Sequence, residues 1–140
     1  MLRTSLIVLS LATLTACGRS PTGTFKTHFG KNVPPSVSDI SVTGVTALAG
    51  SDVVLTFKIS EEDLEPLLKS RGFRDVIHNQ DRFDGSQISE SEWNRSIKNA
   101  SQAGIEGKKF YELTKMDGLI YYILIFDPKS GRAFYRYIKV

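Results

Sequence analysis

The chain has little cysteine and no long hydrophobic run. Its 140 residues include one cysteine, Cys17, so no disulfide can cross-link the chain within itself. Apolar stretches such as residues 6–14 fall far short of the roughly 20 residues that a membrane-spanning helix needs. The folded part must therefore be stabilised by core packing alone, and a permanent membrane span is not expected.

Histidine is also scarce, and neither sign of charge dominates. The sequence has 2 histidines, and 18 basic residues against 15 acidic ones give a net charge of +3. So small an excess does not predict a nucleic-acid partner. No serine lies in a nucleophile-elbow motif and no glycine-rich phosphate loop is present. We therefore expect a protein without catalytic activity, cofactor or metal.

The N-terminus has the layout of an export signal. Arg3 precedes the apolar residues 6–14, and small residues follow, as in a secretory signal peptide. The last four residues of this region, Leu14-Thr15-Ala16-Cys17, resemble the lipobox of bacterial lipoproteins. The resemblance implies cleavage after residue 16 and lipidation of Cys17. Ordinary signal peptidase offers an alternative, since Ala16-Cys17-Gly18 also fits its small-x-small site, with cleavage before Arg19.

The lipobox resemblance also implies a location. In this family the cysteine carries a diacylglycerol and an amide-linked acyl chain, typically palmitate, and two such chains already anchor a protein stably. No aspartate follows Cys17, which in the Gram-negative sorting pattern favours the outer membrane. The expected partners are therefore the membrane, through the lipid on Cys17, and an envelope protein.

Residues 17–38 read as the lipidated cysteine and a flexible tether. This stretch contains Pro21, Gly23, Gly30, Pro34 and Pro35 and little apolar periodicity, which is typical of a linker. The domain organisation predicted from the sequence is thus a signal peptide over 1–16, a tether over 17–38 and one globular domain over 39–140.

The globular part alternates between strand and helix patterns. Residues 40–47 and 53–59 predict a hairpin. Ser60 predicts the start of a helix that Gly72 ends, with Pro66 inside it as a kink or a late start. Residues 74–87 read as a polar loop.

The second helix and the last three strands have clearer signals. Ser89 and Glu92 form a capping box for a helix that ends at Gly104. Asp117-Gly118 predicts a hairpin between residues 110–116 and 119–126, followed by a strand over 133–140. We therefore predict an α+β fold in the order ββααβββ, with an antiparallel or mixed sheet and both helices on one face.

Strand alternation gathers tyrosines on one sheet face. Pairing around Asp117-Gly118 places five residues on the side that we expect the helices to leave open: Tyr111, Tyr122, Leu124, Tyr135 and Tyr137. Tyrosine can bury its ring and still form hydrogen bonds, which suits a binding face. The alternative is that the tether or a loop covers these rings.

One further cluster has polar chemistry. His78, Asp81 and Asp84 lie close together in the sequence and could hold a metal or serve acid–base chemistry, although their spacing fits neither a helix nor a hairpin. The alternative is a solvated polar loop. An EF-hand alignment fails because Gln80 and Ser91 stand where acidic ligands are needed.

These observations predict a membrane-anchored envelope lipoprotein that is a non-catalytic binding or structural module. An inhibitor or immunity protein against a hydrolase or toxin is one alternative. A metal-dependent enzyme that uses the 78–84 loop is the other.

Overall fold

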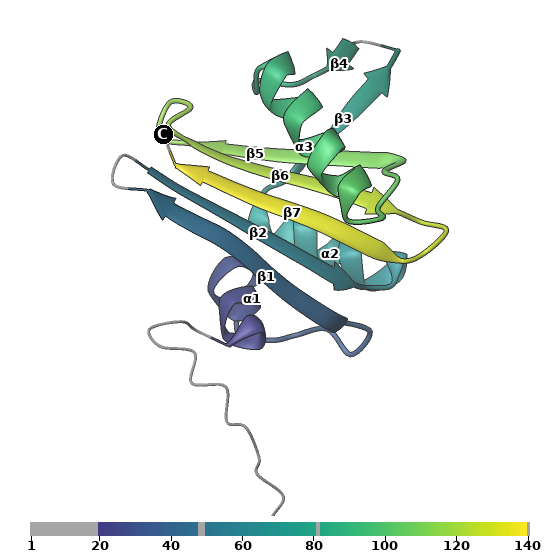
Figure 1. Cartoon of the computed structure of the whole chain (residues 1–140). Helices are drawn as coiled ribbons and strands as arrows, with labels where there is room; N and C mark the ends of the chain where they lie inside the picture. The colour runs from purple at the N-terminus through teal and green to yellow at the C-terminus, as the bar shows by residue number, and fades with distance from the viewer. Residues whose placement is uncertain (1–19, 48–49, 81, 140) are drawn as a thin grey trace, which may run out of the picture.

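The computed structural model describes residues 20–47, 50–80 and 82–139. These residues form one antiparallel sheet with helices packed on both of its faces (Figure 1). The strand order across the sheet is β1-β2-β7-β6-β5-β3-β4. The strands are β1 (Ser38–Ala47), β2 (Gly50–Lys58), β3 (Arg74–Asn79), β4 (Arg82–Asp84), β5 (Lys109–Lys115), β6 (Ile120–Asp127) and β7 (Arg132–Lys139). The helices are α1 (Pro21–Phe29), α2 (Glu61–Arg71) and α3 (Glu90–Gln102).

The predicted fold class is wrong in two respects. The order is αββαββαβββ rather than ββααβββ, because the expected polar loop over 74–87 contains β3 and β4, and a helix precedes β1. The helices also do not share one face. The 74–87 segment has few apolar residues, so the periodicity of its apolar residues does not predict its strands.

The central strands follow the register that the sequence predicts. Asp117 and Gly118 have φ of 53° and 85°, the left-handed values that the preferred hairpin turns require. Leu113 pairs with Tyr122, and Tyr122 pairs with Tyr137. The predicted division of side chains between the two faces of β5, β6 and β7 is therefore confirmed.

Each face of the sheet has its own core. On one side α1 and α2 cover a cluster that includes Leu55, Leu124 and Tyr135. On the other side Trp93 of α3 packs with Ile123 and Ile125. The leucines of α2 pack on the opposite face from Trp93, so the expectation that both helices lie on one face of the sheet is wrong.

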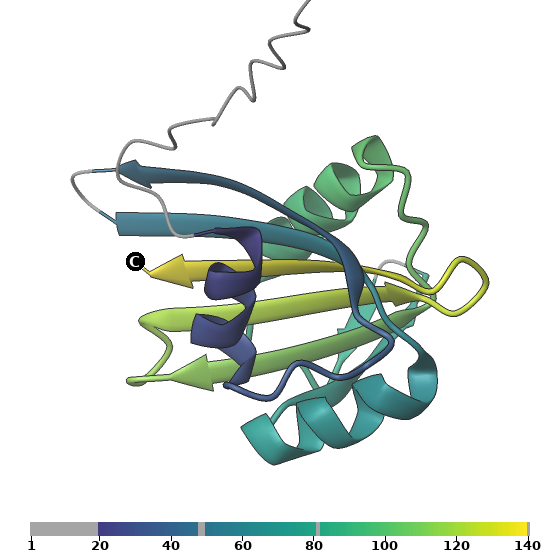
Figure 2. The same cartoon turned by 90° about the horizontal axis from the view of Figure 1, so that it is seen from below.

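Helix α1 replaces most of the expected tether. Ser20 is its N-cap and accepts a hydrogen bond from the Gly23 N–H at 3.0 Å. Phe25 and Phe29 lie one helical turn apart and are 0% and 3% exposed. Figure 2 shows α1 lying across the sheet face that α2 also covers. Residues 20–38 are thus part of the folded domain, and the predicted domain start at 39 is wrong.

Aromatic rings attach α1 to the sheet. The Phe25 ring meets the edge of Phe57 with centroids 5.1 Å apart, and the Phe29 ring lies 4.7 Å from that of Tyr135. Each such pair contributes about 0.5–1.5 kcal/mol beyond the burial of its area. These contacts make α1 a structural element of the core.

The other two helices begin where the sequence predicts. The Ser60 hydroxyl accepts from the Asp63 N–H at 3.2 Å, and Gly72 ends α2 in the left-handed conformation with φ of 85°. Ser89 caps α3 by accepting from the Glu92 N–H at 3.4 Å. Local capping chemistry is therefore sufficient to locate these helix starts.

A buried arginine joins α3 to the sheet. Arg136 of β7 is 3% exposed, and its guanidinium donates to Asp52 of β2 and to Glu92 of α3 at 2.7 and 2.9 Å. Because two carboxylates and the Ser96 hydroxyl receive its N–H groups, the buried charge is compensated.

Candidate functional site

The sheet opens where β3 separates from β5. The two strands pair at three positions, from Arg74 with Glu112 to Val76 with Phe110. Beyond Val76, β3 pairs with β4 instead, while β5 continues along β6 through Lys109. A cleft therefore forms between two strand edges that would otherwise be hydrogen-bonded to each other.

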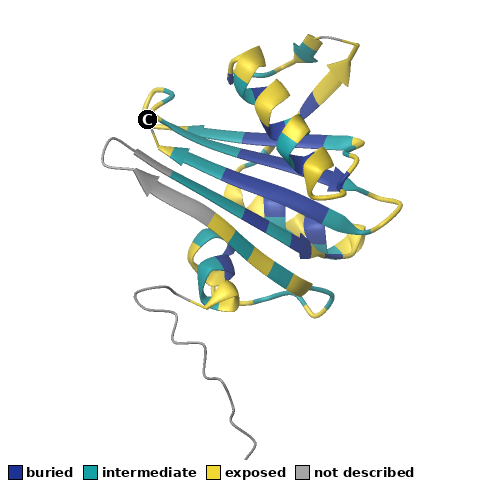
Figure 3. Ribbon diagram, viewed as in Figure 1, coloured by how far each residue is buried: buried dark blue, intermediate teal, exposed yellow. Residues whose placement is uncertain are grey.

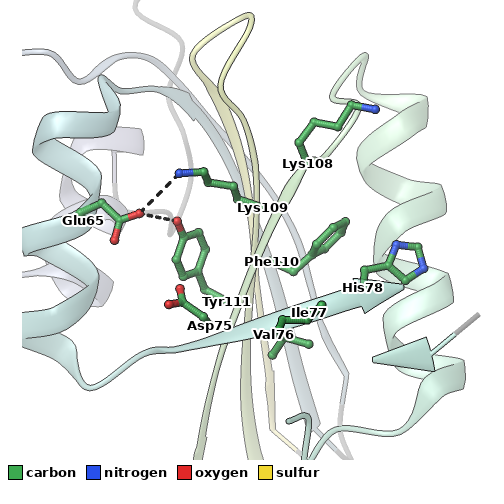
Figure 4. Close-up of a pocket in the computed structure, with 9 residues that line it drawn as sticks. All are labelled: Glu65, Asp75, Val76, Ile77, His78, Lys108, Lys109, Phe110 and Tyr111. Carbon is green, nitrogen blue, oxygen red and sulfur yellow. Dashed lines mark hydrogen bonds and ion pairs between the residues drawn. The ribbon is translucent and has the colours of Figure 1, made fainter. Parts of the chain in front are cut away.

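The cleft has a volume of about 340 Å³. Figure 4 shows that β3 forms one wall, β5 forms the other, and α2 reaches in from the side. Its lining residues are Glu65, Asp75, Val76, Ile77, His78, Lys108, Lys109, Phe110 and Tyr111.

A polar network joins α2 to β5 at one end of the cleft. The Tyr111 hydroxyl donates to Glu65 Oε1 at 2.6 Å, and Lys109 Nζ lies 4.0 Å from the same oxygen. Lys109 also forms a hydrogen-bonded ion pair with Glu61, which raises the pKa of its ammonium. Burial, and then the bond to Glu65, raise the pKa of the Tyr111 phenol well above its ordinary value. These groups bind one another and hold this end of the cleft in place.

Stacked aromatic rings support the β3 side. The His78 ring stacks on Phe83 of β4 at 4.5 Å between centroids, and Phe83 in turn stacks on Trp93 at 5.3 Å. The rings of Phe110 and His78 make an edge contact across the cleft, with their centroids 5.2 Å apart. The β3–β4 hairpin is thus supported by α3, which explains how it can project away from β5.

A buried carboxylate fixes the point at which β3 leaves the sheet. Glu112 is 0% exposed and accepts hydrogen bonds from Arg74, from the Ser86 hydroxyl and from the Gln87 N–H at 2.7–2.8 Å. Trp93 Nε1 donates to the same Ser86 hydroxyl at 2.7 Å. Because every donor comes from outside β5, this network ties β3, the 85–88 segment and α3 to the sheet.

The cleft side chains of Asp75, Ile77 and Lys108 face solvent. Ile77 is 65% exposed, which is unusual for a large aliphatic residue on a strand. Neither Lys108 nor Asp75 forms an ion pair within the described part of the chain. The cleft therefore offers a ligand one cation, one anion and an apolar side chain between two strand edges.

Most of the predicted tyrosine face lies inside the protein. Tyr111, Leu124 and Tyr135 are 3%, 0% and 0% exposed beneath α1 and α2, while Tyr122 and Tyr137 are half-buried. The Tyr135 hydroxyl forms a hydrogen bond of 2.7 Å with His28 Nδ1. The alternative interpretation, that residues of the expected tether cover these rings, matches the structure at Tyr135 and Tyr137. A freely exposed binding face of all five residues does not match it.

The His78, Asp81 and Asp84 cluster does not converge. Asp81 lies outside the described residues. His78 pairs with Phe83 in the β3–β4 register and Ile77 with Asp84, so the side chains of His78 and Asp84 lie on opposite faces of the hairpin. Within residues 20–47, 50–80 and 82–139, no group of three His, Cys, Asp or Glu side chains is placed to hold a metal.

Sequence reasoning missed Asp75, Ile77 and Lys108 as site residues. The signal was weak, because Val76-Ile77 is a short apolar pair in a polar stretch and Phe83 is the only aromatic residue of its strand. The separation of β3 from β5 depends on Glu112 and Trp93, which are distant in sequence. Local patterns cannot predict it.

Comparison with protein-family models, with curated proteins and with solved structures gives no match. Cys17 precedes the first described residue. None of the described helices has the length and apolar character needed to cross a membrane.

The raised pKa of the Tyr111 phenol makes the unfolding free energy depend on pH. Its pKa is raised in the folded chain, so unfolding releases its proton once the pH exceeds about 10, the ordinary value. The stability contributed by the neutral phenol is complete below that pH and is lost as the pH rises, at about 1.4 kcal/mol per pH unit. We expect the unfolding free energy of Tyr111→Phe, measured in urea, to fall less steeply above pH about 10 than that of the wild type.

The same variant at neutral pH provides the control. There both states keep the phenol protonated, and Tyr111→Phe loses only the hydrogen bond to Glu65, about 1 kcal/mol. Equal slopes for the two proteins in alkaline solution would contradict this account of Tyr111.

Proposed function

We propose that the protein is a lipid-anchored lipoprotein of the bacterial cell envelope. In this proposal its domain is a non-catalytic module that binds an extended segment of another envelope protein. The observation that carries the binding function is the cleft between β3 and β5, with Ile77 exposed on its wall.

The anchor rests on the lipobox resemblance of Leu14-Thr15-Ala16-Cys17. The structure adds a distance limit, because Gly18 and Arg19 alone separate Cys17 from Ser20, the N-cap of α1. Successive Cα atoms are 3.8 Å apart, so the Cα atoms of Cys17 and Ser20 are at most about 11 Å apart in any conformation. A lipid on Cys17 therefore holds the domain directly against the membrane instead of on a long tether.

The cleft favours an extended peptide as its ligand. Both walls are strands whose mutual pairing stops at Val76 and Phe110, and an inserted strand can use the main-chain groups left there. Ile77 and Phe110 supply apolar contact, while Lys108 and Asp75 can pair with side chains of either charge. A cleft of mixed charge suits a polypeptide better than a small anion.

The side chains of the cleft support binding rather than catalysis. Lys109 and Tyr111 are held by Glu61 and Glu65. His78, the histidine of the cleft, is stacked on Phe83 and makes an edge contact with Phe110. This arrangement lacks the aligned nucleophile and base that covalent catalysis needs.

Lipidation is tested by the substitution Cys17→Ser. In a bacterial host grown with labelled palmitate, we expect the wild type to carry the label and to sediment with membranes. Cys17→Ser is expected to lose both properties, since the thioether cannot form on serine. Ser20→Ala serves as the control, because it removes the cap of α1 but leaves the lipobox intact. A labelled, membrane-bound Cys17→Ser protein would refute the anchor.

Binding in the cleft is tested by photo-crosslinking in the intact envelope. A photoreactive amino acid at position 77 is expected to capture one discrete protein, and the same group at Asn94, exposed on α3, is expected to capture none. Lys108→Glu should lower the yield from position 77 about tenfold, the loss of one charged contact, whereas Lys98→Glu on α3 should not. Equal capture from positions 77 and 94 would contradict the cleft as the binding site.

A second candidate function is inhibition of, or immunity to, an envelope hydrolase or toxin. The observation in its favour is the β3–β4 hairpin, which projects from the sheet with mostly exposed residues (Figure 3). Phe83 of the hairpin stacks on Trp93 of α3, which holds the hairpin rigid. The hairpin could therefore enter an enzyme's active site without losing conformational freedom. The crosslinked protein distinguishes the two functions, since an inhibitor forms a stable one-to-one complex in which the partner's activity is lost.

A further inference from the structure

The tip of the β5–β6 hairpin exposes two large apolar side chains. Met116 is 65% exposed and Leu119 is 52% exposed, and the Leu119 N–H donates to the Met116 carbonyl at 3.2 Å across the turn. Met116 itself has φ of 54°, a left-handed value that is unfavourable for a side chain of this kind. Nothing in the described fold covers this pair, although burying it would stabilise the domain.

Lysines lie directly behind the tip. Lys115 of β5 pairs with Ile120 of β6, and Ile120 pairs with Lys139 of β7, so the three side chains form one row on the same face of the sheet. The Lys115 ammonium lies 5.5 Å from the centre of the Tyr122 ring. We define the hairpin patch as Met116, Leu119, Ile120, Lys115 and Lys139.

Half-buried tyrosines form the next row. Tyr122 and Tyr137 lie side by side with their ring centroids 5.3 Å apart. Apolar side chains at a tip, lysines behind them and then tyrosine rings follow the order of groups that proteins present to a membrane interface. Lysine ammonium groups complement the phosphates and the negative charge of anionic headgroups.

The described helix nearest in sequence to the anchor, α1, lies on the same side of the protein. Helix α1 packs on the sheet face that carries Tyr122 and Tyr137, and the His28 ring lies 5.3 Å from that of Tyr137. Figure 2 shows α1 toward the end of the sheet where β7 ends and the β5–β6 hairpin turns. With at most about 11 Å between the Cα atoms of Cys17 and Ser20, the membrane lies close to this part of the domain.

We propose that the hairpin patch docks on the bilayer that holds the Cys17 lipid, with Met116 and Leu119 inserted among the acyl chains and Lys115 and Lys139 at the headgroup phosphates. The proposal rests on the lipid anchor described above. Docking orients the domain, and the β3–β4 hairpin, at the far edge of the sheet from α1, is directed away from the anchor.

The test uses the lipidated protein in vesicles of phosphatidylethanolamine and phosphatidylglycerol. Because Cys17 carries lipid, a cysteine introduced by Met116→Cys or Ile77→Cys is the only free thiol and accepts a spin label. Met116 and Ile77 are both 65% exposed, so they are matched in the absence of a membrane. We expect the label at 116 to be shielded from a water-soluble relaxation agent and relaxed by oxygen from the lipid phase, and the label at 77 to behave in the opposite way.

Equal access of the water-soluble agent to both labels would overturn the docking. Adding Lys115→Glu and Lys139→Glu to the Met116→Cys protein should raise that access, since the headgroup contacts are lost. No change on their addition would also count against it.

A second measurement separates docking from anchoring. With Cys17→Ser protein and the same vesicles, we expect weak sedimentation that falls about tenfold on Met116→Glu but not on Ile77→Glu. Equal sedimentation of these two variants would refute the docking whether or not Cys17 is lipidated. Failure of the anchor itself is detected separately, as an unmodified Cys17 in the mass spectrum of the wild type.

Discussion

The packing of Phe25 and Phe29 against Phe57 and Tyr135 is the contact on which the rest of the structure depends. It places α1 in the core and buries Tyr135, part of the tyrosine face that the sequence alone presents as a binding surface. It also brings the folded domain to within two residues of Cys17. The two surfaces proposed for binding and for membrane docking therefore lie elsewhere, at the opposite edge of the sheet and at its hairpin tip.

The two proposed surfaces follow from how the sheet ends. At the β3 edge, buried Glu112 and the stacked rings of Phe83 and Trp93 direct β3 away from β5 and leave a cleft. At the β5–β6 turn, the left-handed residues 116–118 hold Met116 and Leu119 outside the core. In the proposed arrangement the hairpin tip docks on the membrane and the cleft is left open to a partner.

The sequence predicts those parts of the fold that local chemistry determines. Asp117-Gly118 locates the central hairpin, and strand alternation then assigns the faces of β5, β6 and β7 correctly. Ser60 and Ser89 locate two helix starts. Each of these signals acts within a few residues, which is why no tertiary information is needed.

Helix α1 and strands β3 and β4 were not predicted, because their formation depends on long-range contacts. The α1 segment contains a proline and a glycine and resembles a linker in sequence. Its helix is stabilised because Phe25 and Phe29 pack on a sheet whose strands follow it in the sequence. Strand β3 is a short apolar pair among polar residues, and its position depends on Glu112, 36 residues after Val76. The candidate cleft lies between β3 and β5, which are distant in the sequence, so it could not be predicted from either strand alone.

Native-state hydrogen exchange of the mature protein tests the central claim most directly, namely that α1 belongs to the core. If α1 packs as described, the amide of Gly30, which donates to the Lys26 carbonyl, opens only with the larger unit that includes β2 and β7. The account predicts protection of the α1 amides comparable to that of the amides of Leu55 and Tyr135. Exchange of the α1 amides at the rate of an unstructured peptide, while the sheet remains protected, would contradict it.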